Sequence, residues 1–532
     1  VYQVMPPTSS GGSGSGGAGT TSAMDIYSDL DLTGGIQFSK NGTEKVGINV
    51  YGNFSTGGVG LTGIDTLSTT GNVTVTSSAY IKNIYTNGNV TLEGSARADL
   101  ISAKGWIYTK SGGTQGDLYA DKYINITNGS LKNANTLSYI DWPSGGGTAQ
   151  ILTAGGYVNF GSSSVNTIRA KGNVNLSTWG TVSDVMSEGK IKCVSTNWGN
   201  YTLLKAISFE SCPTKNATTL PAGTDSIVAT GALVTVTAPN KPLVNALSYE
   251  SQANYILDVD SNSKPVVTVK NVDGIPSGKY YIAKYTSNNI EYIGKLCPGI
   301  DTSGFCTGTS VGYIYPPNTG SWNTVISYSG GTWSLRDNNN QNPSLAPGVF
   351  LFKGNLNPQT GKYANAFLST GSITYGTSII LEAPNYAGAN KVCNSTGFGR
   401  PTNLCSSNTA LIPAAIGNIA LLAGSCTNAT TAASCQATYS GGNITLESSA
   451  KVYGNVIAGN LLNTSGDSTI VGSLLAAGLG DITQKSKFSG STTIDLTSLK
   501  DHPDFSTGDN NSGSTSTGSG QMAATVKWAR YL

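Results

Sequence analysis

Apolar and polar residues repeat with a period of 17 between Gly71 and Ile126. Three of the four copies open with glycine and the fourth with lysine, after which apolar and polar side chains alternate. A second apolar column precedes each copy by six residues. Apolar columns at a fixed short period are typical of a solenoid, in which each turn lays a strand on the equivalent strand of the turn before. We therefore predict an all-β fold, a parallel β-helix of about 17 residues per turn. The copies are Gly71–Val75, Gly88–Leu92, Gly105–Thr109 and Lys122–Ile126, and the second column is Leu67, Ile84, Ile101 and Leu118.

Two details of the repeat make specific structural predictions. Val73, Val90, Ile107 and Ile124 should stack in one column, with neighbours about 4.8 Å apart, the spacing of strands in a sheet. We also expect glycine to open each strand because it takes a positive φ without a steric penalty.

The period continues beyond this stretch and is interrupted once. It resumes at Gly156–Phe160, runs to Gly189–Cys193, and returns at Gly354–Asn357. Between residues 194 and 347 it disappears, and period-two runs such as Lys279–Tyr285 favour strands joined by turns. We predict that this stretch is a β-rich domain inserted on one turn of the solenoid, where repeat arrays display their variable parts.

These boundaries divide the chain into five parts. The first is a flexible linker, because its Gly/Ser composition cannot bury enough surface to fold. The last is a Ser/Thr/Gly tail with a final strand. The parts are the linker 1–22, an N-terminal β-helix 23–193, an inserted disulfide-containing domain 194–347, a C-terminal part of the β-helix 348–500 with disulfide-stapled loops, and the tail 501–532.

Charge and hydropathy narrow the range of partners. Only 11% of the residues are charged, and 31 basic against 29 acidic residues give a net charge of +2 without a basic stripe. We therefore predict no nucleic-acid partner. The most apolar window, Ala410–Gly424, is too short and too interrupted to span a bilayer, so we predict no membrane span. The sequence begins with Val1 rather than Met and shows no charged-then-apolar leader peptide, so we expect that a leader was removed.

The eight cysteines all lie between residues 193 and 435. Eight cysteines allow 105 pairings, but pairing of neighbours closes the shortest loops and fits their grouping. We therefore predict four local disulfides in an oxidising, exported location, with eight unpaired buried thiols as the alternative. The predicted pairs are Cys193–Cys212, Cys297–Cys306, Cys393–Cys405 and Cys426–Cys435.

Residues suited to catalysis are few. A glycoside hydrolase needs carboxylates that converge on one face, yet Glu93, Asp99 and Asp117 share no column of the repeat. His502, the single histidine, precedes a low-complexity tail, a poor place for a rigidly held base. Asp258–Asn262 begins like a calcium loop but lacks the glycine and the glutamate that fix its geometry. We predict no enzyme activity, no catalytic residue, no metal and no cofactor, with a carbohydrate-active β-helix enzyme as the alternative.

Aromatic side chains gather in the inserted domain. Tyrosine and tryptophan rings stack on sugars and suit recognition surfaces, so we predict that Tyr313, Tyr315, Trp322 and Trp333 bind a ligand. Alternatively, these rings fill the core of the domain itself. The outward positions of the solenoid are mostly Thr, Ser, Asn and Lys and offer few such anchors. We therefore expect the inserted domain to recognise a host surface, a glycan or a pilus or filament partner.

Four later segments are Ala346–Leu356, Asn365–Gly371, Ile416–Gly424 and Gly454–Asn460. They resemble segments of β-helical surface proteins of Gram-negative bacteria that are associated with type IV pili. The end of the solenoid is also similar to the short-repeat β-helix of bactofilin-type polymer-forming proteins. The resemblance implies surface display and association with a pilus.

These patterns predict a non-enzymatic extracellular or cell-surface protein of the adhesin type. In this interpretation a rigid solenoid stalk presents the inserted domain. A subunit that self-assembles end to end through its open strand edges is the alternative within the structural class, and the carbohydrate-active enzyme is the alternative from another class.

Overall fold

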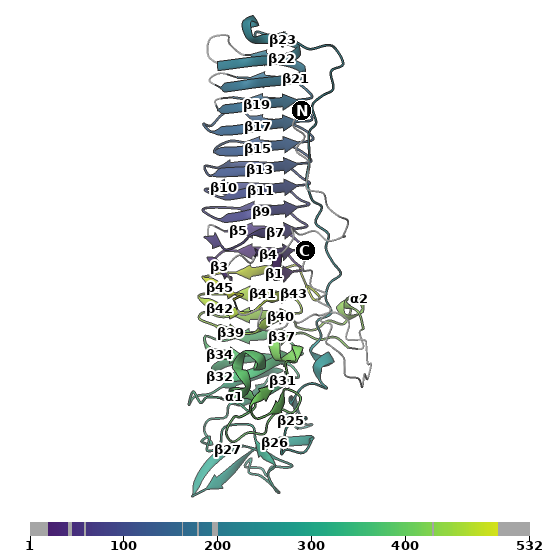
Figure 1. The fold of residues 1–532 in the computed structure, drawn as a ribbon. Coiled ribbons are helices and arrows are strands. Elements are labelled where there is room, and N and C mark those ends of the chain that lie inside the picture. Colours follow the sequence, from purple (N-terminus) through teal and green to yellow (C-terminus); the bar gives the residue numbers. More distant parts are fainter. Residues whose placement is uncertain are drawn as a thin grey trace.

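The computed structural model describes residues 20–40, 45–57, 60–161, 163–177, 180–193, 200–427 and 430–497. Nearly all of the strands in these ranges belong to one sheet, which winds into a long solenoid (Figure 1). Strands of successive turns pair in parallel, so the predicted parallel β-helix is confirmed. The predictions for most of the linker, for His502 and for the tail concern residues outside the described ranges.

The clearest part of the repeat stacks as predicted. Val73, Val90, Ile107 and Ile124 are register partners in four successive strands, and all four side chains are buried. Because equivalent apolar residues point inward on every turn, they form a core that is continuous along the solenoid. The second column is also continuous and runs through Leu67, Ile84, Ile101 and Leu118.

The glycine that opens each copy has a different role from the predicted one. Gly71, Gly88 and Gly105 are not among the described glycines with positive φ. A Cβ atom added to Gly88 would lie 2.5 Å from the carbonyl oxygen of Gly71, and one added to Gly105 would lie 2.6 Å from that of Gly88. The expectation of positive φ is therefore wrong here, and glycine is needed because successive turns approach too closely for a side chain.

Residues 20–219 form the N-terminal arm, the upper part of the solenoid in Figure 1. The solenoid continues past residue 193, because β22 pairs in parallel with β21 and β23 adds to β22. There Ile191 pairs with Phe209 and Val185 with Leu204, spacings longer than 17 that hid this turn from the repeat. The strands are β1 (Thr20–Ile26), β2 (Leu30–Leu32), β3 (Ile36–Ser39), β4 (Lys45–Val50), β5 (Phe54–Thr56), β6 (Leu61–Thr62), β7 (Thr66–Thr69), β8 (Val73–Val75), β9 (Tyr80–Thr86), β10 (Val90–Gly94), β11 (Arg97–Ala103), β12 (Ile107–Ser111), β13 (Thr114–Ala120), β14 (Ile124–Ile126), β15 (Ser130–Thr136), β16 (Ile140–Trp142), β17 (Thr148–Ala154), β18 (Val158–Phe160), β19 (Ser164–Ala170), β20 (Val174–Leu176), β21 (Thr181–Cys193), β22 (Asn200–Glu210) and β23 (Ala217–Thr219).

Residues 220–245, which we call the strap, contain no strand and run back along the side of the solenoid (Figure 1). Side chains of the N-terminal arm hold the strap. The N–H of Ala232 donates to Asp121 Oδ1 at 2.7 Å. Asn87 makes two bonds to Val236, accepting from its N–H at 2.9 Å and donating to its carbonyl at 2.7 Å.

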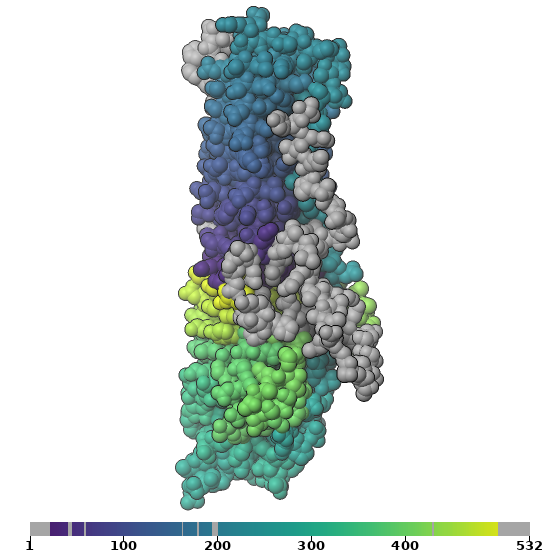
Figure 2. Space-filling view, viewed as in Figure 1, coloured from purple at the N-terminus to yellow at the C-terminus, as the bar shows by residue number. Residues whose placement is uncertain are grey.

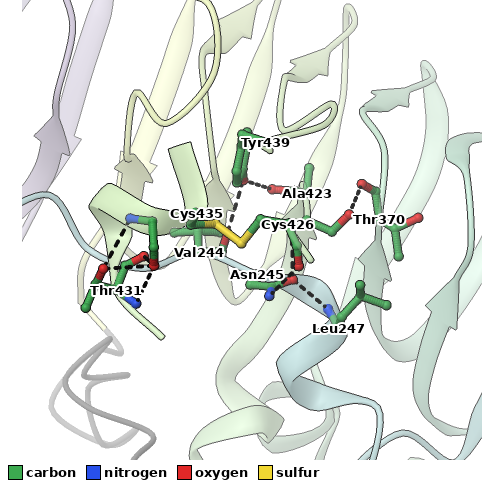
Figure 3. Close-up of a disulfide and its surroundings, with 11 residues drawn as sticks. Val244, Asn245, Leu247, Thr370, Ala423, Cys426, Thr431, Cys435 and Tyr439 are labelled. Carbon is green, nitrogen blue, oxygen red and sulfur yellow. Dashed lines mark hydrogen bonds between the residues drawn. A yellow bond between two sulfur atoms is a disulfide. The ribbon is translucent and has the colours of Figure 1, made fainter. Parts of the chain in front are cut away.

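The lower end of the strap is fixed beside the Cys426–Cys435 disulfide (Figure 3). Asn245 Nδ2 donates to the carbonyl of Cys426 at 3.0 Å, and the N–H of Cys426 donates back to Asn245 Oδ1 at 3.3 Å. The hydroxyl of Tyr439 donates to the carbonyl of Val244 at 3.1 Å. The strap therefore ties the N-terminal arm to the part of the solenoid that follows it in the chain.

Residues 246–336 form the tip module, at the lower end of the solenoid in Figure 1. It joins the solenoid through β24, which pairs in parallel with β31, and through β30, which pairs in parallel with β32. The stretch 194–347 thus contains the last turn of the N-terminal arm, the strap and the tip module. The strands of the module are β24 (Tyr255–Val259), β25 (Pro265–Val269), β26 (Gly278–Ser287), β27 (Ile290–Cys297), β28 (Gly312–Tyr313), β29 (Ile326–Ser329) and β30 (Thr332–Arg336).

Residues 348–497 form the C-terminal arm, which climbs from the tip module back toward the start of the chain (Figure 1). Its regular turns resemble those of the N-terminal arm, and two short helices lie in the loops between them. The elements are β31 (Gly348–Phe352), β32 (Asn355–Ser369), β33 (Ile373–Tyr375), β34 (Ser378–Glu382), α1 (Pro384–Val392), β35 (Cys405–Ser407), β36 (Ala410–Leu411), β37 (Ile419–Ala423), α2 (Ala432–Gln436), β38 (Ile444–Leu446), β39 (Lys451–Tyr453), β40 (Asn455–Ala458), β41 (Leu462–Thr464), β42 (Ser468–Val471), β43 (Leu474–Ala476), β44 (Ser486–Phe488) and β45 (Thr492–Asp495).

The two arms meet where the last turn of the described residues packs against their first turn. β43 pairs in parallel with β1, β44 with β2 and β45 with β3. We call this contact the seam, and in Figure 2 it is where purple residues meet yellow ones. Buried apolar side chains of both arms belong to one cluster, so the core continues across the seam. The chain therefore enters the solenoid near its middle rather than at one end.

All four predicted disulfides are present, and they use all eight cysteines. Each closes a local loop of 9 to 19 residues. In the described ranges, no helix is long and apolar enough to cross a membrane. Disulfides persist in oxidising compartments, so the four disulfides fit an exported, extracellular protein.

Candidate recognition surface at the tip

The tip module carries a long antiparallel hairpin made of β26 and β27, to which β28 is added. Each strand of the hairpin buries some of its side chains, among them Ala283 and Leu296, which are fully buried. Asn288 and Asn289 form the turn with φ of 50° and 60°, a conformation that asparagine tolerates better than most residues. The hairpin thus holds its outward side chains on a rigid frame.

Three tyrosines and a lysine come together on this frame. The ring centroid of Tyr285 lies 5.4 Å from that of Tyr292 and 5.9 Å from that of Tyr313. Lys295 Nζ lies 4.3 Å from the ring centroid of Tyr285 and 5.6 Å from that of Tyr313, within the range of cation–π attraction. All four side chains are only partly buried, so solvent reaches the cluster.

Trp322 lies on the loop beside this cluster and is the most exposed aromatic side chain of the tip, at 67%. The loop is fixed to the hairpin because Gly320 bridges to Tyr292 and the N–H of Ser321 donates to the carbonyl of Glu291 at 3.1 Å. We call Tyr285, Tyr292, Lys295, Tyr313 and Trp322 the tip cluster. It is a partly exposed aromatic surface with one ammonium group, held by β26, β27, β28 and the neighbouring loop.

Burial raises the pKa of Tyr285 above its ordinary value of 10. Its hydroxyl is therefore neutral at physiological pH, and it accepts a hydrogen bond from the N–H of Asn318 at 3.0 Å. The cluster combines aromatic faces, neutral hydroxyl groups and one cation. Such a combination suits binding of polar ring-containing ligands better than it suits proton transfer.

The structure separates the four predicted ligand-binding residues into two pairs. Tyr313 is half-buried and Trp322 is exposed, whereas Tyr315 and Trp333 are fully buried. The hydroxyl of Tyr315 accepts from the N–H of Ile326 at 2.8 Å, and Trp333 Nε1 donates to the carbonyl of Lys353 at 2.9 Å. Tyr315 and Trp333 are therefore core residues and do not belong to the exposed aromatic surface of the tip.

Three members of the tip cluster are absent from the predicted set, namely Tyr285, Tyr292 and Lys295. The period-two run Lys279–Tyr285 does predict a strand, which puts alternate tyrosines on one face. No local pattern, however, brings Lys295 over the ring of Tyr285. That contact depends on the pairing of β26 with β27, and it can be found only once the hairpin register is known.

A small apolar recess lies next to the hairpin. Ile282, Ile293, Ile326 and Tyr315 line it, Lys264 is at its rim, and its volume is about 210 Å³. A space of this size can hold one small apolar group. The recess could therefore receive a single side chain or ring of a larger ligand that also contacts the tip module.

A second aromatic row lies on the N-terminal arm. Trp106, Tyr123, Tyr139 and Tyr157 stack on successive turns with centroid separations of 5.9, 4.9 and 4.6 Å and nearly parallel rings. Tyr123 and Tyr139 are covered on both faces by stacked rings, and Trp106 and Tyr157 on one face each. The row therefore stabilises the stack of turns and offers a ligand less aromatic face than Trp322 does.

Groups suited to metal binding do not gather in the described part of the chain, where no cluster of three or more His, Cys, Asp or Glu occurs. The calcium-like segment Asp258–Asn262 leads into the turn between β24 and β25. Asp260 Oδ1 accepts from the N–H of Asn262 at 2.8 Å and from that of Lys264 at 2.9 Å. The bond from the Lys264 N–H is the main reason that the pKa of Asp260 lies below its ordinary value, so this carboxylate serves the turn.

Comparisons of the chain with family models, with curated proteins and with solved structures give no significant match. A shared fold would in any case not imply a shared function. The function has therefore to be argued from the tip cluster and from its place on the solenoid.

Proposed function

We propose that this protein is a non-enzymatic, adhesin-like protein of the cell surface or extracellular space. In this proposal the solenoid is a rigid stalk and the tip module recognises a host surface, a glycan or a pilus partner. The four disulfides support an exported location. The association with a type IV pilus rests on the sequence resemblance alone.

The observation that carries this proposal is the exposure of Trp322 beside the three tyrosines of the tip cluster, at the end of a long solenoid. Binding energy in interfaces concentrates in a few tryptophan, tyrosine and arginine anchors. Trp322 leaves two thirds of its surface in solvent, where a partner can reach it. Recognition through the tip accounts for both its exposure and its position.

The test is a binding comparison of two matched variants on host cells and a glycan array. Trp322→Ala should weaken binding by about 30-fold, the effect of losing an anchor worth about 2 kcal/mol. Tyr157→Ala, which removes an exposed ring from the N-terminal arm, should bind like the unmodified protein. Full binding by Trp322→Ala, or an equal loss in both variants, would contradict the proposal.

End-to-end polymerisation is the second candidate within the structural class. It requires open strand edges at both ends of the solenoid. One end carries the tip module, and at the other end β23 pairs with Leu204–Ala206 and so covers part of the outer edge of β22. These features favour the stalk, and electron microscopy of the purified protein distinguishes single rods from fibres. The carbohydrate-active enzyme is tested by a glycan-degradation screen.

A further inference from the structure

The seam has the same construction as the contacts inside each arm. Leu474 in β43 pairs with Val456 on one side and with Met24 on the other, in parallel register both times. The seam contains three such strand pairs, and no covalent link joins its two sides directly. The first turn of the chain can therefore accept the last turn of any chain with this sequence, its own or that of a second copy.

The covalent link between the arms has a hinge at the level of the seam. Residues 237–240 of the strap are exposed. Val236, just before them, is held by Asn87 of the N-terminal arm. Lys241, just after them, donates to the carbonyl of Gly478 in the C-terminal arm. The carbonyl of Asn240 accepts from the hydroxyl of Tyr27 in the N-terminal arm at 3.5 Å, a contact at the seam that the first turn of a second copy can supply equally. Turning the chain at 237–239 would thus move one arm relative to the other without disturbing the remaining strap anchors.

Apolar side chains are exposed along the strap on the N-terminal arm. Val228 and Leu233 of the strap are 82% and 44% exposed, and Leu137 of the arm is 52% exposed. The strap passes close to Leu137, because a Cβ atom added to Gly231 would lie 2.9 Å from Leu137 Cδ1. Single exposed apolar residues are common, but several on one face mark a surface that can be covered.

We propose that two copies of this chain exchange their C-terminal arms, so that the last turn of each pairs with the first turn of the other. Exchange of identical elements is a low-cost route to a dimer because every seam contact is retained. The five steps from Val236 to Lys241 reach at most about 17 Å. The two solenoids must therefore lie side by side with their straps facing, an arrangement that also covers Val228 and Leu233.

The experiment uses cysteines that can meet only across an exchanged seam. Gln37 in β3 and Thr493 in β45 are register partners on adjacent strands. Thr62 in β6 is the register partner of Gln37 on the opposite edge of β3, so it lies two strand spacings, about 9.6 Å, from Thr493. A chain with Gln37→Cys and a differently tagged chain with Thr493→Cys are produced and exported together. Non-reducing electrophoresis should show a disulfide-linked dimer carrying both tags. The matched pair Thr62→Cys with Thr493→Cys should not form one, because a disulfide does not span that distance.

Two further measurements decide the outcome. Differently tagged unmodified chains should co-purify when they are produced together and should not when they are mixed after folding. Leu233→Asp should lower the yield of the linked dimer by about tenfold, because it places a charge between the facing straps. Absence of co-purification, or equal crosslinking by the Thr62→Cys pair, would overturn the proposal.

Discussion

Replacing Asn87 by alanine should detach the middle of the strap from the N-terminal arm. The Asn87 side chain bonds to both the N–H and the carbonyl of Val236, as a neighbouring strand would. Val236 is only 3% exposed, so water cannot replace these bonds unless the strap lifts. The variant therefore converts a held segment into one that opens locally, without removing any apolar side chain from the core.

The size of the effect follows from the two lost bonds. A typical hydrogen bond contributes about 1 kcal/mol net, so their loss should lower the free energy of strap opening by about 2 kcal/mol. That difference corresponds to a roughly 30-fold larger population of the open strap. A strap that stayed in place would instead bury an unpaired N–H and an unpaired carbonyl, at a cost of about 1–3 kcal/mol each. About 30-fold is therefore the smallest change in the open population that we expect.

Hydrogen exchange at the Val236 amide measures this opening directly. Protection should fall about 30-fold in Asn87→Ala, while Val90, whose N–H bonds to the next turn within the arm, should keep its protection. Asn166→Ala changes an exposed asparagine of the same arm and should alter neither amide. Unchanged protection at Val236, or an equal loss at Val90, would refute the assignment of Asn87 as a strap anchor.

Two further predictions concern the regions on either side of this anchor. Burial of Asp31 opposes its ionisation, but the hydrogen bond and charge of Lys485 across the seam outweigh it and hold the pKa of Asp31 below its ordinary value of 3.8. Ionised Asp31 therefore stabilises the fold at pH values above 3.8. The difference in Tm between the unmodified protein and Asp31→Asn should shrink as the pH falls below about 4. A Tm difference that stays constant with pH would contradict this prediction. Replacing Cys426 and Cys435 by serine removes a loop closure worth roughly 2.5 kcal/mol. The Ala246 amide at the lower strap anchor should therefore lose protection from hydrogen exchange, while the amides of the N-terminal arm should keep theirs. An equal loss of protection in both places would show that the disulfide supports the whole solenoid.

The fold class could be predicted because solenoid turns constrain one another locally. Val73 and Val90 fall 17 residues apart because each turn must return to the same column, and this constraint is visible in the sequence itself. The disulfides were predictable for a related reason. Each joins cysteines that are neighbours in the chain, such as Cys297 and Cys306, so no long-range geometry was needed.

The order of the turns in space could not be predicted. Leu474–Ala476 carries the same short apolar pattern as Val456–Ala458 and packs equally well against Met24–Ile26. Main-chain hydrogen bonds form equally with either strand, so the sequence does not show which strand will be the neighbour. The strap was not predicted either. Its alternating apolar residues resemble a strand, but it contains no strand and is held by the side chains of Asp121 and Asn87.

Half of the predicted recognition residues, Tyr315 and Trp333, are in the core, and for Tyr315 the reason is the short length of β28. Tyr313 and Tyr315 are two residues apart and would share one face of a continued strand. β28 ends at Tyr313, so the alternation does not extend to Tyr315, whose ring is fully buried and whose hydroxyl accepts from the N–H of Ile326. The alternation of residues in the sequence does not show where such a short strand ends.

The seam also explains why the strap is needed. The strands that pair at the seam are about 450 residues apart in the chain. The entropic cost of closing a loop rises with the logarithm of its length, so closing the seam costs about 3 kcal/mol more than closing one turn on the next. It should therefore be the last contact to form and the first to open. The strap crosses it and keeps the arms together. Main-chain groups of the solenoid are used in bonds between turns, so the strap has to be held by side chains such as Asn87, Asp121 and Asn245.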